Sequence, residues 1–138
     1  MNILVDTSVW SLALRRNPRE LSATERSLVT ELGEVIQDGR ARVIGVVRQE
    51  LLSGIKAQDQ FEKLRLTLRA FPDEPIHASD HESAAKACND CRAKGIAVSS
   101  VDILICAVAL SRRWSILTTD PDFKTYSKVL PLNLHSSR

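Results

Sequence analysis

The sequence predicts an α/β fold in which helices cover a mostly parallel sheet. Short apolar runs, typical of buried strands, alternate along the chain with longer segments of helical periodicity. No internal repeat, low-complexity tract or obvious linker interrupts this alternation. A length of 138 residues fits one domain, which at that size buries roughly 70% of the surface that its unfolded chain exposes. We therefore expect a single domain over residues 1–138 with a self-sufficient core.

The first part of the chain predicts a strand followed by two helices. Residues 2–6 (NILVD) are a short apolar run that ends in an acid, which favours a buried, central and parallel strand. Residues 7–16 are expected to form a helix. Ser22 and Glu25 have the S-x-x-E spacing of a capping box, and Gly39 suits the end of the helix that they open.

The middle of the chain predicts a second strand and two shorter helices. Residues 42–46 (RVIGV) have the composition of a strand. The helix expected after this strand carries Glu50 one turn from its start. Residues 61–71 place apolar side chains on one side of an amphipathic helix, and a turn-rich connection follows.

A second capping-box spacing, at Ser79 and Glu82, predicts a helix that ends at Gly95. Cys88 and Cys91 form a C-x-x-C within this helix. Zinc would need three or four ligands, and no second Cys/His pair stands at a suitable spacing. We therefore expect buried, reduced thiols that pack on one face of the helix.

The last third of the chain predicts one more helix and two strands. Residues 101–113 are an apolar run whose length, alanines and preceding serine favour a buried helix. Residues 115–119 (SILTT) and 129–134 (VLPLNL) are expected to be strands. Ligands of parallel sheets gather beyond the carboxyl ends of the strands, so polar residues there are the first candidates for a functional site.

Composition and charge favour a soluble protein with an anionic partner. No apolar run approaches the ~20 residues that span a bilayer, and the start MNILVDTSVW lacks the basic region of a signal peptide, so we expect a cytoplasmic protein. The chain has 19 basic and 17 acidic residues, a formal net charge of +2. If five acids converge on a metal, a basic surplus of seven remains to attract a polyanion. Ordinary solvated charge is the alternative interpretation.

Five carboxylates fall at strand ends or helix starts. Asp6, Asp120 and Asp122 follow predicted strands, whereas Glu50 and Asp102 lie near the start of predicted helices. We expect them to face one edge of the sheet, where like charges stay ionised only if a cation compensates them. All-oxygen ligands select a hard cation such as Mg²⁺, Mn²⁺ or Ca²⁺. Such a cation activates water and stabilises a leaving oxygen in phosphoryl chemistry.

Each acid taken alone also has a structural interpretation. Asp102 could complement the positive end of a helix, and Glu50 could be an ordinary surface acid. No Ser/His/Asp order and no Gly-rich phosphate loop competes with the carboxylates for the chemistry. The histidines fall in loops or on polar faces and are not expected to be catalytic: His77, His81 and His135.

Four motifs stand in order along the chain: VDTSVW at 5–10, VVRQELLSG at 46–54, SSVDILICAVA at 99–109 and LTTDPDF at 117–123. In this order they resemble the motifs of the PIN-domain ribonucleases, and specifically of the VapC-type toxins of bacterial toxin–antitoxin pairs. The resemblance covers essentially the whole chain. Cys106 departs from the family pattern, in which a small alanine is common.

The resemblance implies a single PIN-like nuclease domain, a three-layer α/β/α sandwich that cuts RNA with Mg²⁺ or Mn²⁺. Asp6, Glu50, Asp102 and Asp120 would be catalytic and would bind the metal. Asp122 would be a fifth ligand only in some members, because the family differs in which acid of this motif reaches the metal. Metal-bound water would attack the phosphodiester and leave 3′-hydroxyl and 5′-phosphate ends.

The resemblance also implies supporting residues and partners. Thr118 would support the site through a hydroxyl hydrogen bond, and Thr7 and Ser8 would contact water or phosphate. Capping or turn bonding is the alternative for all three. A small VapB-type antitoxin protein would block the site, and homodimers are common in the family.

Three further residues are candidates for RNA binding. Trp10 could stack on a base, although packing in the core or in a dimer interface competes with that interpretation. Arg15 and Arg16 could hold phosphates, with solvation or pairing with Glu20 as the alternative.

Two other functions compete with the nuclease hypothesis. A non-catalytic PIN-like module that binds RNA or protein would have lost key acids, and none is missing here. A phosphorylated receiver domain also places acids at strand ends, but it needs paired acids after its first strand and a lysine after its last. Here one acid follows the first strand, and Lys124 does not stand at a strand end. The nuclease hypothesis therefore leads.

Overall fold

A parallel three-stranded sheet lies at the centre of the fold. The computed structural model describes residues 1–136. The strands run β1 (Ile3–Val5), β2 (Ala41–Arg42) and β3 (Ser115–Leu117), in the spatial order β2-β1-β3. Both pairings are parallel. The predicted parallel sheet with the first strand in its centre is therefore confirmed.

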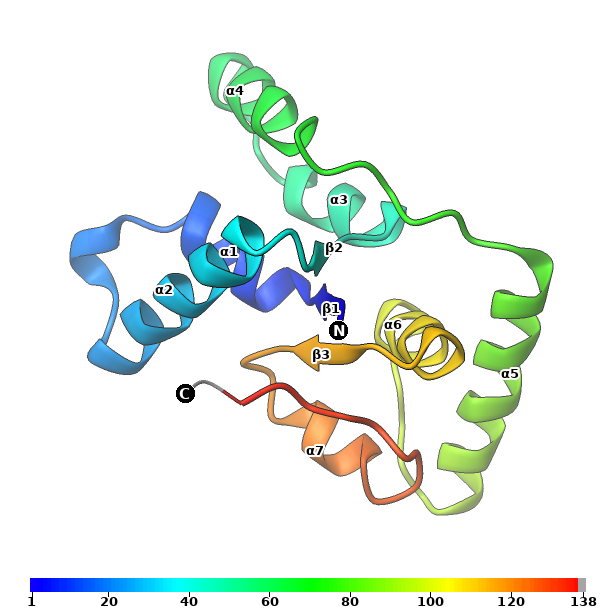
Figure 1. The fold of residues 1–138 in the computed structure, drawn as a ribbon. Helices are drawn as coiled ribbons and strands as arrows, with labels where there is room; N and C mark the ends of the chain where they lie inside the picture. Colours follow the sequence, from blue (N-terminus) through cyan, green and yellow to red (C-terminus); the bar gives the residue numbers. More distant parts are fainter. Residues whose placement is uncertain (137–138) are drawn as a thin grey trace.

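Helices cover the sheet on both sides, as Figure 1 shows. α1 and α2 lie on one side of the strands, α5 and α6 on the other, and α7 lies beyond β3. The predicted three-layer α/β/α sandwich is thus confirmed. The helices are α1 (Thr7–Leu14), the 3₁₀ helix η1 (Pro18–Glu20), α2 (Ala23–Gln37), α3 (Gly45–Leu52), α4 (Gln58–Leu68), α5 (Ala78–Ala93), α6 (Ser100–Arg112) and α7 (Asp122–Tyr126).

Burial explains why two segments are apolar without alternation. All three residues of β1 are fully buried, because helices cover both faces of the sheet. Every side chain of α6 from Ile103 to Ala109 is also buried, which confirms the predicted buried helix. No helix among residues 1–136 is long and apolar enough to cross a membrane.

Local capping signals fix several helix ends. Ser22 and Glu25 form the predicted capping box. The Glu25 N–H donates to Ser22 Oγ at 3.1 Å, and the Ser22 N–H donates to Glu25 Oε1 at 2.9 Å. Gly39 and Gly95 end α2 and α5 with positive φ angles of 71° and 76°, which glycine adopts without strain. Cys91 is buried and Cys88 partly buried within α5, and both are free thiols.

The second predicted capping box was wrong. α5 begins at Ala78, so Ser79 lies inside the helix and His77 is the residue that caps it. The Asp80 carboxylate accepts a hydrogen bond of 2.8 Å from the His77 N–H. The acid in the first turn therefore supplies the cap.

The strands predicted at 42–46 and 129–134 differ most from the structure. β2 ends at Arg42 and α3 begins at Gly45, because the apolar residues between them fill the core as a connection rather than as a strand. The segment 129–134 pairs only through a bridge between Leu134 and Ile116. Pro131 in this segment has no N–H to donate to a ladder.

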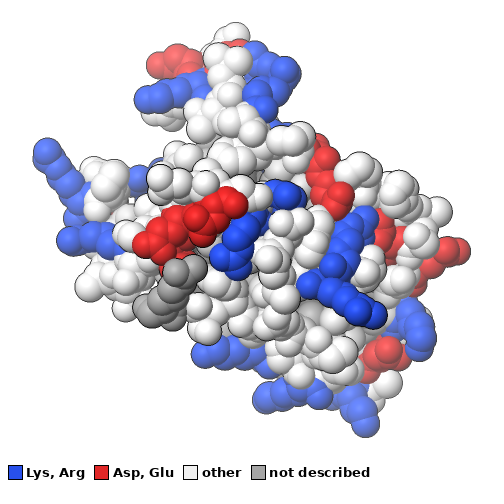
Figure 2. All heavy atoms as spheres, in the orientation of Figure 1, with Lys and Arg blue, Asp and Glu red and all other residues white. Residues whose placement is uncertain are grey.

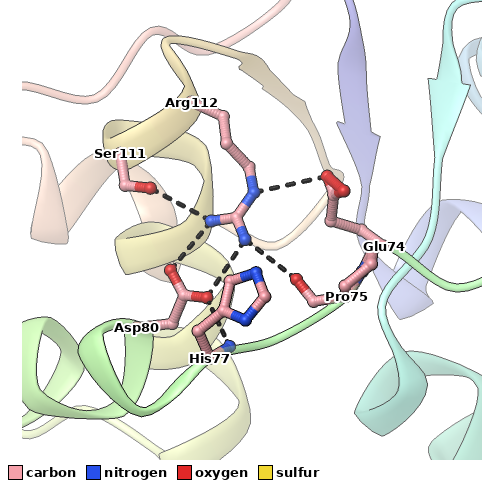
Figure 3. A network of polar contacts seen from close by, with 6 residues as sticks. All are labelled: Glu74, Pro75, His77, Asp80, Ser111 and Arg112. Carbon is pink, nitrogen blue, oxygen red and sulfur yellow. Dashed lines mark hydrogen bonds and ion pairs between the residues drawn. The ribbon is translucent and has the colours of Figure 1, made fainter.

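An arginine cluster joins α5, α6 and the connection before α5, as Figure 3 shows. Arg112 donates to both oxygens of Asp80 at 2.8 and 3.0 Å and to the Pro75 carbonyl at 2.9 Å. Glu74 lies 3.3 Å from the same guanidinium. Asp80 is only 4% exposed, and the bonds from Arg112 hold the pKa of its carboxyl at about 2. The cluster therefore fixes α5 against α6, the helix that carries Asp102.

Substitution Asp80→Ala should lower the free energy of unfolding by about 3 kcal/mol, because it leaves a mostly buried guanidinium with only Glu74 as its ion-pair partner. The pKa of Asp80 is lowered on folding, so its stabilisation is full above the ordinary value of 3.8 and is lost as the pH falls towards 2. Urea unfolding between pH 7 and 2 measures both effects. Asp90→Ala, at an exposed position of α5, should change stability by less than about 0.5 kcal/mol. Equal losses in the two variants would contradict the assignment.

Candidate metal centre

Asp6 follows β1 directly and is held at the carboxyl end of the sheet. Its N–H donates to the Leu117 carbonyl at 2.9 Å, which extends the pairing of β1 with β3 by one bond. The side chain is 5% exposed, and its Oδ2 accepts bonds from Ser8 Oγ at 2.7 Å and Thr118 Oγ1 at 2.8 Å. Oδ1 has no hydrogen-bond donor among residues 1–136, so it is the oxygen left for a ligand.

The same two hydroxyls also fold the turn after β3. Ser8 Oγ accepts a bond of 3.1 Å from the Thr119 N–H, and Thr118 Oγ1 accepts one of 3.0 Å from the Asp120 N–H. Thr118 thus bonds both Asp6 and the Asp120 N–H. Ser8 bonds both Asp6 and the Thr119 N–H, which is the turn bonding named as its alternative. The carboxyl ends of β1 and β3 are thereby bound to each other.

Asp102, Asp120 and Asp122 form a cluster of three carboxylates. Each offers an oxygen that lies within 4.8 Å of the oxygens of the other two. Asp120 stands in the turn after β3, and Asp122 begins α7 and donates its N–H to Asp120 Oδ1 at 2.9 Å. Asp102 reaches the cluster from the first turn of α6.

Asp102 is held from two sides. Its N–H donates to Ser99 Oγ at 3.1 Å, which is the predicted serine cap of α6. Its Oδ2 accepts a bond of 2.8 Å from the hydroxyl of Tyr126. Partial burial raises the pKa of Asp102, the Tyr126 bond opposes this rise, and the nearby charges of Asp6 and Asp120 add to it.

Tyr126 was not predicted as a site residue. It lies 24 positions from Asp102 along the chain, so no local spacing joins the two. The only signal in the sequence is that Phe123 and Tyr126 stand three apart, where both face the core on one side of a short helix.

Glu50 stands apart from the three-carboxylate cluster. It is exposed on α3, and its Oε1 accepts a bond of 2.6 Å from Thr7 Oγ1. Both residues line a hollow of about 420 Å³ together with Arg15 and Val101, the neighbour of Asp102 in the chain. The structure therefore places Glu50 beside the site, on the wall of an adjoining hollow. The Thr7 hydroxyl is also used within the protein.

The candidates for RNA binding differ in exposure. Trp10 is 1% exposed and packs on Phe71 with ring centroids 5.0 Å apart, so its ring is not available to stack on a base. Arg15 is exposed on the hollow next to Glu50. Arg16 lies 3.8 Å from Glu25, and not near Glu20 as one interpretation had it.

The chemistry of the donor set fits a hard divalent cation. Three carboxylates within 4.8 Å of one another supply oxygen ligands only, which suits Mg²⁺ or Mn²⁺. Cys106 lies one turn after Asp102, but burial and the nearby negative charges raise the pKa of its thiol. A protonated thiol is a poor ligand, so no soft donor joins the set.

The sequence matches the model of one protein family. A family model described as PIN domain matches residues 3–129. The chain belongs to the PIN domain family. No curated protein sequence matches it closely enough to be compared.

Solved structures show the same PIN-domain fold. A chain in the crystal structure of FitAcB from Neisseria gonorrhoeae is similar to this chain, with a TM-score of 0.74 and 20% identity over 96% of each chain. VapBC2 from Rickettsia felis, bound to a DNA fragment from their promoter, gives a TM-score of 0.74 at 17% identity over 98% of each chain. VapBC-5 from Mycobacterium tuberculosis, a member of the VapBC family of toxin–antitoxin systems, gives 0.65 at 17% identity, over 97% of this chain and 98% of that one. At these identities the likeness establishes the fold.

In the absence of metal, Asp102→Asn should make the protein more stable at neutral pH. The pKa of Asp102 is raised on folding, so the folded chain holds more protons than the unfolded one just above the ordinary value of 3.8. The free energy of unfolding therefore falls as the pH rises through this window, and the amide removes that loss.

Urea unfolding in chelator at pH 3 and pH 7 measures the effect, with Asp90→Asn as an exposed control. The gain should be present at pH 7 and small at pH 3. An Asp102→Asn variant that is less stable than the parent at pH 7 would contradict the electrostatic account.

Proposed function

We propose that this protein is a metal-dependent endoribonuclease of the VapC type, with residues 1–138 working as one nuclease domain. The observation that carries the proposal is the cluster of Asp102, Asp120 and Asp122, with the charge of Asp6 close enough to raise the pKa of Asp102. Within residues 1–136, no lysine or arginine forms an ion pair with any of these four acids. Membership of the PIN domain family supports the proposal.

The side chains divide the proposed work between binding and orientation. Asp102, Asp120 and Asp122 would hold Mg²⁺ or Mn²⁺, and Asp6 would contribute Oδ1 while Ser8 and Thr118 hold its other oxygen. The bound cation would supply an activated water and offset negative charge at the phosphodiester. In this scheme RNA is left with 3′-hydroxyl and 5′-phosphate ends.

Glu50 has a separate place in this scheme. Thr7 donates to its Oε1, which fixes the carboxylate on the wall of the adjoining hollow. Its second oxygen would then bind water or accept a proton from it. Glu50 is therefore proposed to orient the reaction and not to belong to the tightest part of the metal site.

A basic groove next to the site suits an anionic substrate. A second hollow of about 760 Å³ lies between the end of α1, the loop after α3, and α4, and it shares Arg15 with the hollow at Glu50. Lys56 and Lys63 also line it, and no Asp or Glu of the described chain does. Over the face of the molecule that it draws, Figure 2 shows acidic and basic side chains intermixed. The local arrangement thus favours phosphate binding at this groove.

We also propose that the protein is the toxin of a toxin–antitoxin pair. The support is that the similar solved structures include members of the VapBC family of toxin–antitoxin systems. The partner would be a small VapB-type antitoxin that covers the carboxylate site, and the toxin would form a homodimer.

Purified protein should cleave single-stranded RNA with Mn²⁺ or Mg²⁺ and lose activity in chelator. Asp6→Asn and Asp102→Asn should each lower the cleavage rate by about 100-fold or more, because each removes charge that compensates the cation. Gel assays with end-labelled RNA measure the rate and also identify the product ends.

Asp90→Asn controls for loss of a surface charge and should cleave at the parental rate. Cleavage that persists in chelator and in both site variants would contradict the metal-dependent mechanism. RNA binding without cleavage under any metal would favour the non-catalytic module instead.

Lys56→Gln and Lys63→Gln should each weaken RNA binding and reduce its salt dependence by about one ion. The physical reason is that each side chain would neutralise one phosphate in the groove. Filter binding at several salt concentrations, with Mn²⁺ replaced by Ca²⁺ to slow cleavage, measures the slope. Lys86→Gln, exposed on α5 away from the groove, is the matched control. Unchanged RNA binding in both groove variants would indicate that the groove binds a protein partner and not RNA.

A further inference from the structure

Tyr126 makes an unusual contact for a buried aromatic residue. It is the last residue of α7, its side chain is 3% exposed, and its hydroxyl donates to Asp102 Oδ2 at 2.8 Å. The ring packs edge-on against Phe123, with centroids 5.3 Å apart and an interplanar angle of 71°. A buried hydroxyl needs a partner, and this one has a carboxylate of the proposed metal site.

The direction of this hydrogen bond is fixed. The Tyr126 hydroxyl points its oxygen at Asp102 Oδ2 across 2.8 Å, and a phenol carries one proton to donate. An ionised Asp102 can only accept, so Tyr126 donates. A bond to an ionised acceptor is stronger than a neutral one and holds the carboxylate in one orientation.

Helix α7 touches the acid cluster at both ends. Asp122 begins the helix and belongs to the cluster, and Tyr126 ends it and bonds Asp102. The turn before α7 carries Asp120, whose Oδ1 accepts the Asp122 N–H. One short segment therefore supplies two of the clustered acids and holds the third in place.

We propose that Tyr126 is a positioning residue of the metal site, whose hydroxyl occupies Oδ2 of Asp102 so that Oδ1 is the oxygen presented to the cation. This inference rests on the proposed metal-binding function and adds to it a residue outside the carboxylate set. The hydroxyl also draws negative charge from Asp102, which lessens its repulsion with Asp6 and Asp120. Without the hydroxyl, the carboxylate turns more freely and binds the cation more weakly.

The test is Mn²⁺ binding by Tyr126→Phe, measured by electron paramagnetic resonance of free Mn²⁺ without any RNA. The phenylalanine keeps the ring that packs on Phe123 and removes only the hydroxyl. Loss of a partner that orients a metal ligand weakens metal affinity by about 10–100-fold, and we expect a loss in that range. Ser127→Ala is the matched control, because it removes a hydroxyl that bonds the Phe123 carbonyl at the end of the same helix. It should bind Mn²⁺ as the parent does.

A second background separates positioning from a general effect on the fold. In Asp102→Ala the hydroxyl has no carboxylate to hold, so adding Tyr126→Phe should change Mn²⁺ affinity by less than about twofold. An equal loss in both backgrounds, or parental affinity in Tyr126→Phe, overturns the positioning role while leaving the metal site intact. Absence of Mn²⁺ binding by the parent protein overturns both the role and the proposed function.

Discussion

Repulsion among carboxylates is the constraint on which the site depends. Asp102, Asp120 and Asp122 come from two separate segments to within 4.8 Å of one another, and the charges of Asp6 and Asp120 add to the rise in the pKa of Asp102 that burial causes. Within residues 1–136, neutral donors and not cationic side chains bond these acids. Two hydroxyls bond Asp6, one bonds Asp102, and a backbone N–H bonds Asp120. Neutral donors hold the oxygens in place and leave negative charge to attract a metal.

The pKa values of Asp80 and Asp102 are shifted in opposite directions. Asp80 is paired with Arg112, its pKa is lowered, and it stabilises the packing of α5 on α6. Asp102 projects from the other end of α6, where its pKa is raised because burial and like charges outweigh its hydrogen bonds. Near its end α6 thus carries the base of an ion pair with α5, and at its start it carries an acid whose pKa is raised. The ion pair between Arg112 and Asp80 therefore holds in place the helix that carries Asp102.

The parts of the fold that the sequence predicted well are those set by local chemistry. The capping box at Ser22, the serine cap of α6 and the glycine at the end of α2 each depend on residues within one turn of the chain. The predictions for 42–46 and 129–134 were less accurate, because burial makes a connection as apolar as a strand. The start of α5 was predicted at Ser79, whereas the helix is capped at His77, whose N–H bonds the Asp80 carboxylate.

The sequence by itself determined the kind of site, because acids that follow parallel strands or open helices supply only hard oxygen donors at one edge of a sheet. It also determined the family, through four motifs in order. Only the tertiary structure decided which acids come within 4.8 Å of one another, and it placed Asp122 inside that group and Glu50 beside it. It alone brought Tyr126 to Asp102. The physical reason is that this contact depends on how the fold brings the end of α7 to the start of α6, and no spacing along the chain records that approach.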